Sequence, residues 1–133
     1  MSSAEAVLAA FERLPALAAA DGDLRRRARH ASMDVALGIG AETLLLRIVE
    51  GEVREATRGP FLLRPWTFAL RAEPAAWSAF LADPPPPGSH DLLAMSKRGV
   101  LRIEGDLQPL MANLQVLKDI LALPRGQVAA GKG

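Results

Sequence analysis

The residues of this chain that could do chemistry are few, and the most suggestive of them are neighbours. Ser89, His90 and Asp91 are contiguous, and these are the residue types of a nucleophile, a base and an orienting acid. In such catalytic sets, however, the three side chains converge from separate elements of the fold. A structural role accounts for them more simply. We expect Ser89 to cap a short helix that has Asp91 in its first turn.

No other cluster predicts catalysis or metal binding. The only histidines are His30 and His90, and the chain has neither cysteine nor tyrosine. Without cysteine there are no disulfides and no thiolate metal sites. Glu50, Glu52 and Glu55 surround a turn and are interpreted as solvated charge rather than as metal ligands. Because a glycine-rich phosphate loop is also absent, we expect no metal ion, no cofactor and no enzymatic activity. An enzyme such as a hydrolase or an isomerase is kept as a third hypothesis.

A group of arginines is the one polar feature with two interpretations. Arg25, Arg26, Arg27 and Arg29 lie close together, just after two aspartates. They form either a solvated surface segment or a site for anionic groups, such as lipid headgroups or the phosphates of an acyl-CoA. For the second interpretation the candidates are Arg25, Arg26 and Arg27.

The composition is that of one globular domain. The chain has 133 residues, 50% of them apolar and 23% charged, and a net charge of +1. Such a charge gives no field that attracts nucleic acid, and no apolar run approaches the roughly 20 residues of a membrane-spanning helix. The first ten residues lack a basic segment, so we expect no secretory signal and a cytoplasmic protein. High alanine and arginine usage suggests a bacterial source. We expect one domain over residues 1–125 and a flexible tail over 126–133.

The spacing of apolar residues predicts an α+β order of elements. A helical stripe from Val7 to Leu14 begins the chain. Five segments of strand character follow, over residues 33–39, 43–49, 53–57, 66–71 and 100–104. Short turns join the first of them, so the sheet should be mainly antiparallel. Two short helices are expected between the last two strands, one beginning at Pro74 and one after Ser89.

The C-terminal third carries an unusually apolar helix. It is predicted to begin after Asp106, to run from Leu107 to Leu123 and to stop at Pro124. Its main stripe contains Leu107, Leu110, Met111, Leu114, Leu117 and Leu121, with Val116, Ile120 and Leu123 beside it. These positions cover roughly twice the 100° of an ordinary surface helix. The helix must therefore bury a second side against other helices, a second subunit or a ligand, and periodicity leaves these alternatives open.

The segment from Gly99 to Arg125 resembles the end of the sterol carrier protein 2 family domain, in which a G-x-L-x-I-x-G-D strand leads directly into an apolar helix. The strand with Trp66 and Phe68 and the helix with Trp77 also follow the order of that family. The resemblance implies an α+β fold with about five mainly antiparallel strands, covered on one face by helices, and an apolar cavity between the two layers. It also implies binding of a sterol, fatty acid, fatty acyl-CoA, phospholipid or isoprenoid quinone, without a catalytic set.

The resemblance makes the apolar residues of the second half candidates for the cavity wall. They are Trp66, Phe68, Leu70, Trp77, Phe80, Leu81, Met95, Leu101, Ile103, Leu110, Met111, Leu114, Leu117 and Leu121. We therefore favour a non-enzymatic carrier of an apolar, lipid-like ligand, with at most peripheral membrane contact. The alternative is an interaction module. In that case the excess apolar face, including Leu117 and Ile120, forms a homodimer or docks an enzyme of lipid or quinone metabolism.

Overall fold

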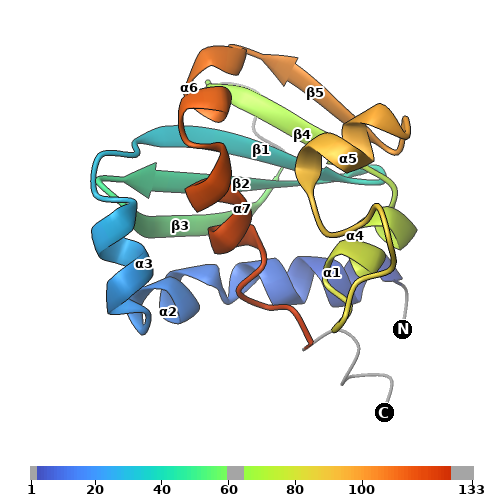
Figure 1. Cartoon of the computed structure of the whole chain (residues 1–133), viewed down its shortest axis with the longest axis horizontal. Helices are drawn as coiled ribbons and strands as arrows, with labels where there is room; N and C mark the ends of the chain where they lie inside the picture. The colour runs from blue at the N-terminus through green and yellow to red at the C-terminus, as the bar shows by residue number, and fades with distance from the viewer. Residues whose placement is uncertain (1–2, 60–64, 127–133) are drawn as a thin grey trace.

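A five-stranded sheet with helices packed against it organises the chain (Figure 1). The computed structural model describes residues 3–59 and 65–126. The strands are β1 (Met33–Ile39), β2 (Glu42–Val49), β3 (Glu52–Arg58), β4 (Phe68–Ala72) and β5 (Leu101–Gly105). The helices are α1 (Ser3–Glu12), α2 (Leu14–Ala19), α3 (Gly22–Arg27), α4 (Pro74–Phe80), α5 (Leu92–Lys97), α6 (Leu107–Ala112) and α7 (Leu114–Leu121). The predicted α+β class and the five strands are confirmed.

The strand order of the sheet is β3-β2-β1-β4-β5, so the sheet is open and β3 and β5 are its edges. Three pairings are antiparallel, as expected, but β1 and β4 are parallel, with Leu37 opposite Leu70. After β3 the chain passes back across two strands before it forms β4. The short turns between the first strands could not predict this pairing, because β4 does not lie beside the strand that precedes it.

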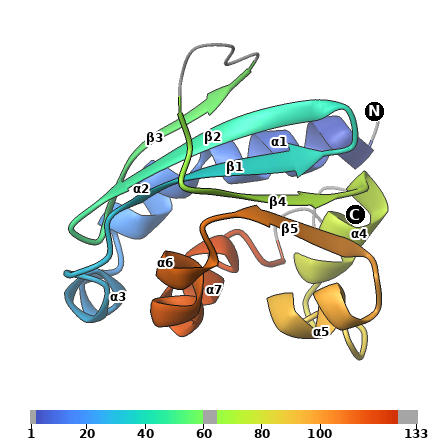
Figure 2. The same ribbon diagram turned by 90° about the horizontal axis from the view of Figure 1, so that it is seen from above.

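One face of the sheet carries almost all of the core. On β1 the side chains of Met33, Val35, Leu37 and Ile39 point to this face and are at most 5% exposed. Side chains from all seven helices join the same cluster, so the helices cover this face (Figure 2). Alternation along the strands sends polar residues to the opposite face, among them Arg47 and Arg71.

Trp77 fixes the helical layer to the central strand. Its side chain is fully buried, and its indole Nε1 donates a 2.8 Å hydrogen bond to the Gly38 carbonyl oxygen. The rings of Phe11 and Phe80 meet the indole edge to face, at centroid distances of 5.4 and 5.9 Å. Residues from α1, α4 and β1 are therefore held at one point.

The helix that contains Leu92 begins two residues later than predicted. The prediction that Ser89 caps it is wrong, because the cap is Asp91, whose carboxylate accepts a hydrogen bond from the Leu93 amide. Both residues can cap a helix, and the sequence alone does not rank them. Ser89 instead precedes the helix, and it is buried, with 5% of its surface exposed.

The predicted single helix from Leu107 to Leu123 is also wrong, because the chain breaks at Asn113 into α6 and α7. Asn113 leaves helical geometry (φ −123°, ψ 23°), and its side-chain amide donates a 2.9 Å hydrogen bond to the Pro109 carbonyl. Asparagine competes in this way with the hydrogen bonds of a helix backbone. Figure 2 shows α6 and α7 as two separate helical segments.

The end of the described chain is tied to the core. The Gly126 amide donates a 2.8 Å hydrogen bond to the Leu81 carbonyl. The remainder of the predicted flexible tail, residues 127–133, lies outside the described residues. In the parts of the chain that the structure describes, no helix combines the length and apolar character needed to span a membrane.

An arginine on the edge strand β3 joins that strand to α1. The guanidinium of Arg58 donates hydrogen bonds of 2.8–2.9 Å to both carboxylate oxygens of Glu5 and to those of Glu12. These hydrogen bonds from Arg58 hold the pKa of Glu5 below its usual value.

We expect the stabilising effect of Arg58 to depend on pH. A carboxyl whose pKa is lower in the folded state stabilises the fold above its unfolded pKa, and this contribution is lost as the pH falls through the folded pKa. Arg58→Gln should therefore lower the free energy of unfolding in urea at about pH 7 and have a much smaller effect at about pH 3. An equal effect at both pH values would contradict an electrostatic role for Arg58.

Candidate functional site

The structure brings twelve of the fourteen predicted wall residues into one apolar cluster under the helices. Ten of them are buried core residues, namely Phe68, Leu70, Trp77, Phe80, Leu81, Met95, Leu101, Leu110, Leu117 and Leu121, and Ile103 and Leu114 pack against these with partial exposure. The twelve come from β4, β5 and the four helices that follow β4, and they are part of a single core cluster that also includes side chains of β1, β2 and α1–α3. The twelve residues form the candidate site.

Two of the predicted residues do not reach this cluster. The Trp66 side chain is 38% exposed, and the guanidinium of Arg71 lies 6.0 Å from its ring. Because Arg71 is on the polar face of the sheet, Trp66 belongs to that face. Met111 on α6 is 54% exposed, and Leu107 on the same helix is 46% exposed. Both lie on α6, before the break at Asn113, whereas Leu110 on the same helix and Leu117 and Leu121 on α7 are buried.

Two groups of short helices cover the candidate site. In Figure 2, α4 and α5 form one group and α6 and α7 the other, on the same side of the sheet. Leu110, Leu117 and Leu121 of the second group are at most 1% exposed, as are Phe80 and Met95 of the first. The candidate site is thus a closed apolar interior between two helix groups.

A guanidinium marks one end of this interior. Arg125 follows α7, and its Nε donates a 3.0 Å hydrogen bond to the Phe80 carbonyl oxygen. Its Cζ lies 4.9 Å from the centre of the Phe80 ring, while its Nη2 is buried and has no hydrogen-bond partner among the residues that the structure describes. Burial lowers the pKa of Arg125, and the nearby carboxylates of Asp83 and Asp119 oppose that shift. The only pattern around Arg125 in the sequence is the preceding proline, which indicates a helix end and not a site.

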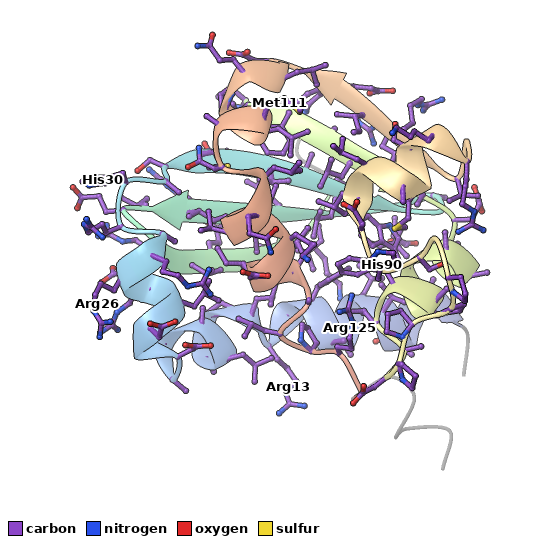
Figure 3. The ribbon with its side chains drawn as sticks, in the orientation of Figure 1. Arg13, Arg26, His30, His90, Met111 and Arg125 are labelled. Carbon is purple, nitrogen blue, oxygen red and sulfur yellow. The ribbon has the colours of Figure 1, made fainter. Side chains whose placement is uncertain are left out.

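Figure 3 places Met111 and Arg125 at opposite ends of the segment formed by α6 and α7. The buried leucines of these two helices lie between them in the sequence. One end of the segment therefore carries an exposed thioether, and the other carries a partly buried cation.

The arginine cluster lies on α3, outside the apolar interior. Arg27 is bound to Asp23 and, through a 3.0 Å ion pair, to Asp119 of α7. Hydrogen bonding to Asp119 and then to Asp23 raises the pKa of Arg27. Arg26 is 3.5 Å from Asp23, whereas Arg25 has no carboxylate partner among the described residues. Arg27 thus connects two helices, and Arg25 is left as the available cation of the predicted headgroup candidates.

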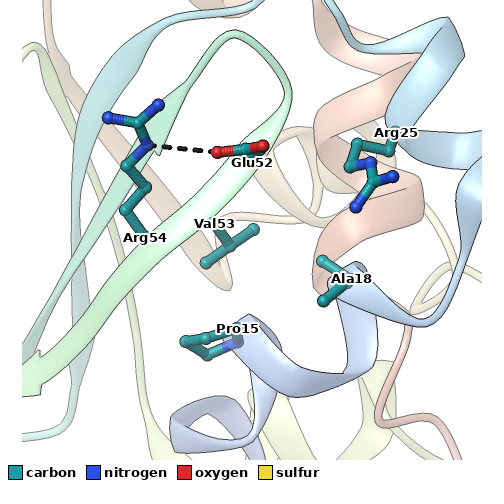
Figure 4. A pocket seen from close by; sticks show the side chains of 7 residues that line it. Pro15, Ala18, Arg25, Glu52, Val53 and Arg54 are labelled. Carbon is teal, nitrogen blue, oxygen red and sulfur yellow. Dashed lines mark hydrogen bonds and ion pairs between the residues drawn. The ribbon is translucent and has the colours of Figure 1, made fainter.

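Arg25 lies at a small pocket of about 160 Å³ between α2 and the edge strand β3. Pro15, Ala18 and Val53 form its apolar wall, and Glu52 and Arg54, joined by a 3.2 Å ion pair, also line it (Figure 4). This pocket has room for a small group and contains none of the fourteen predicted wall residues.

A wider surface groove of about 800 Å³ lies at the other end of the sheet, lined by residues from β4, α4 and the chain around Gly99. Its arginines are already engaged. Arg71 and Arg102 both bind Glu104, at 3.0 and 2.7 Å, and Arg98 donates to the hydroxyl of Ser89. The hydrogen bond from Arg71 is the main cause of a lowered pKa at Glu104.

The Ser89-His90-Asp91 run is structural. Ser89 accepts a hydrogen bond from Arg98, Asp91 caps α5, and His90 is exposed. Within the described residues, no three histidine or acidic side chains are grouped so that they could hold a metal ion.

Comparison with known proteins identifies the fold. No family model and no curated protein sequence matches the chain. A crystal structure of sterol carrier protein 2 is similar with a TM-score of 0.62 and 18% identity, over 93% of this chain and 94% of that one. A conserved hypothetical protein of Thermus thermophilus, described as a possible sterol carrier protein, also has a TM-score of 0.62, at 19% identity and over 86% and 85% of the two chains.

A third solved structure is the ubiquinone synthesis protein UbiJ-SCP2. Its TM-score is 0.50 at 17% identity, over 87% of this chain and 82% of that chain. At such identities these likenesses establish the architecture. The open five-stranded sheet, the helices on one of its faces and these structural matches show that the chain is an α+β domain with the sterol carrier protein 2 fold.

Proposed function

We propose that this domain holds an apolar, lipid-like ligand between its sheet and its helices and catalyses no reaction on it. The observation that carries the proposal is a group of twelve apolar side chains within the core, drawn from two strands and four helices, in a fold shared with sterol carrier protein 2. The resemblance to the sterol carrier protein 2 family implies sterols, fatty acids, fatty acyl-CoA, phospholipids and isoprenoid quinones as ligand classes, and an apolar site suits all of them. The likeness to a ubiquinone synthesis protein supports a quinone context.

Binding requires that the helix groups separate. Ten of the twelve side chains are at most 4% exposed, so the interior is closed in this structure. Helices of six to eight residues, such as α5, α6 and α7, gain little stability from their own backbone and open more readily than a sheet does. Each square ångström of ligand hydrocarbon that becomes buried contributes about 25 cal/mol, and this offsets the cost of opening.

A membrane is the natural source of such a ligand, and α3 supplies the contact. Arg25 and Arg26 are exposed. Arg26 lies 3.5 Å from the carboxylate of Asp23, and Arg25 pairs with no carboxylate in the described part of the chain. Exposed arginines are attracted to anionic headgroups. We therefore propose that the protein makes peripheral contact with membranes. As expected from the sequence, we place it in the cytoplasm and propose no role for nucleic acid.

An interaction module is the second candidate function, and the exposed Leu107 and Met111 of α6 favour it. The surface cannot include Leu117 and Ile120, because both are 1% exposed and belong to the core. A homodimer or a docked enzyme of lipid or quinone metabolism would therefore contact α6. Met111→Asp should dissociate such a complex in light scattering without unfolding the domain, since this side chain leaves no core position empty.

The two tryptophans can report where a ligand binds. Trp77 lies in the apolar cluster, and Trp66 lies on the opposite face. In the Trp66→Phe variant, a fatty acid with bromine atoms along its chain should quench the remaining fluorescence strongly, because the quencher must come close to Trp77.

The Trp77→Phe variant is the matched control, since its fluorescence comes from Trp66 alone. It should still bind the brominated fatty acid, as measured by competition with a fluorescent lipid, but show little quenching. Equal quenching of the two variants would contradict a site inside the cluster. Absence of binding to the unsubstituted protein, for fatty acid, sterol and quinone alike, would remove the carrier function.

The contribution of α3 to membrane association can be measured separately. The double variant Arg25→Gln with Arg26→Gln should bind anionic vesicles several-fold more weakly at low salt, because two exposed positive charges are lost. Arg27 is left intact because it connects α3 to α7. The control variant, Arg47→Gln with Arg102→Gln, removes the same charge from the polar face of the sheet. If both variants lose the same affinity, the effect is net charge and α3 is not the contact.

A further inference from the structure

The most unusual polar group in the described chain is the guanidinium of Arg125. Its Nη2 atom is buried and finds no partner within residues 3–59 and 65–126, although an unsatisfied charged donor is among the more costly groups to bury. The two nearby carboxylates do not satisfy it. The oxygens of Asp119 are bound by Arg27 and by Gln115, each at 3.0 Å, and Asp83 is exposed to solvent.

The position of this guanidinium relates it to the apolar interior. Its Nε is bound to the backbone of Phe80 and its face lies over the Phe80 ring, so the α7 end of the chain is joined to α4. Phe80 is fully buried in the apolar cluster. Arg125 therefore bridges the two helix groups at one end of the candidate site, with Nη2 as the donor left for a further acceptor.

We infer that Arg125 binds the head of the ligand and that the ligand is a long-chain carboxylate, with its hydrocarbon among the buried leucines of α6 and α7. This rests on the proposed function and specifies the ligand class. A planar carboxylate matches the geometry of a guanidinium edge, carries a single charge to pair with it, and burial strengthens the pair. A phosphate monoester, with its second negative charge, is disfavoured because the carboxylates of Asp83 and Asp119 lie near Arg125.

The test compares three amphiphiles with the same hydrocarbon chain. Oleate carries a carboxylate, oleamide has a neutral head of similar size, and oleoyl lysophosphatidate carries a phosphate monoester. Each competes with a fluorescent lipid for the full chain at about pH 8, below its micelle-forming concentration. We expect oleate to bind at least about tenfold more tightly than oleamide, the effect of a charge-assisted hydrogen bond. Lysophosphatidate should bind more weakly than oleate.

Variants assign this preference to one residue. Arg125→Gln should bind oleamide as the unsubstituted protein does and lose the preference for oleate. Arg125→Lys, which keeps the charge without the planar fork, should retain a reduced preference. Arg47→Gln removes a positive charge from the polar face of the sheet and should leave the preference unchanged. Oleamide binding also reports whether each variant is folded.

The outcomes separate this inference from the proposed function. Equal affinity of the unsubstituted protein for oleate and oleamide overturns the role of Arg125 and leaves the carrier function standing. If Arg125→Gln and Arg125→Lys both keep the full preference for oleate over oleamide, the role of Arg125 is also overturned. Tighter binding of lysophosphatidate than of oleate overturns the assignment of a carboxylate. If none of the three amphiphiles binds, the inference fails, and the carrier function fails with it only if a sterol and a quinone do not bind either.

Discussion

The side chains of β1 that enter the core all leave the same face of the strand, and the rest of the structure depends on this constraint. β1 is the middle strand of the sheet, so its apolar face sets the face that the helices must cover. The hydrogen bond from Trp77 to the Gly38 carbonyl then fixes the helical layer against this strand. A residue with a Cβ at position 38 would place that atom 2.9 Å from the Arg71 side chain, so glycine lets the polar face pack closely behind the anchor.

What the sequence predicts well is what local spacing determines. The strand over 33–39 and the helix that begins at Pro74 are found where the pattern places them, because period-two alternation and a proline in the first helical turn are local signals. The parallel pairing of β1 with β4 depends on contacts between distant segments. The sequence does not reveal the break at Asn113, because the apolar stripe continues across it. For the same reason the sequence does not show that Met111 is exposed while Leu117 is buried.

The candidate site shows the same division between local and distant information. Twelve of the predicted wall residues share the cluster because core positions are apolar in any sequence of this fold. Arg125 has no comparable signal, since a single arginine after a helix-ending proline is ordinary in sequence. Only the tertiary fold, which brings the chain after α7 to the end of α4, places its guanidinium at the Phe80 ring and buries its Nη2. A polar specificity group in an apolar site is therefore found from tertiary contacts rather than from periodicity.

The central claim is that the interior between the two helix groups holds a lipid-like molecule. Native mass spectrometry of the protein purified from cells without detergent, followed by solvent extraction and identification of the released lipid, tests this most directly. The account predicts one apolar molecule per chain that dissociates when the protein unfolds. A protein that is reproducibly empty, and that stays empty after incubation with fatty acid, sterol and quinone, would contradict it.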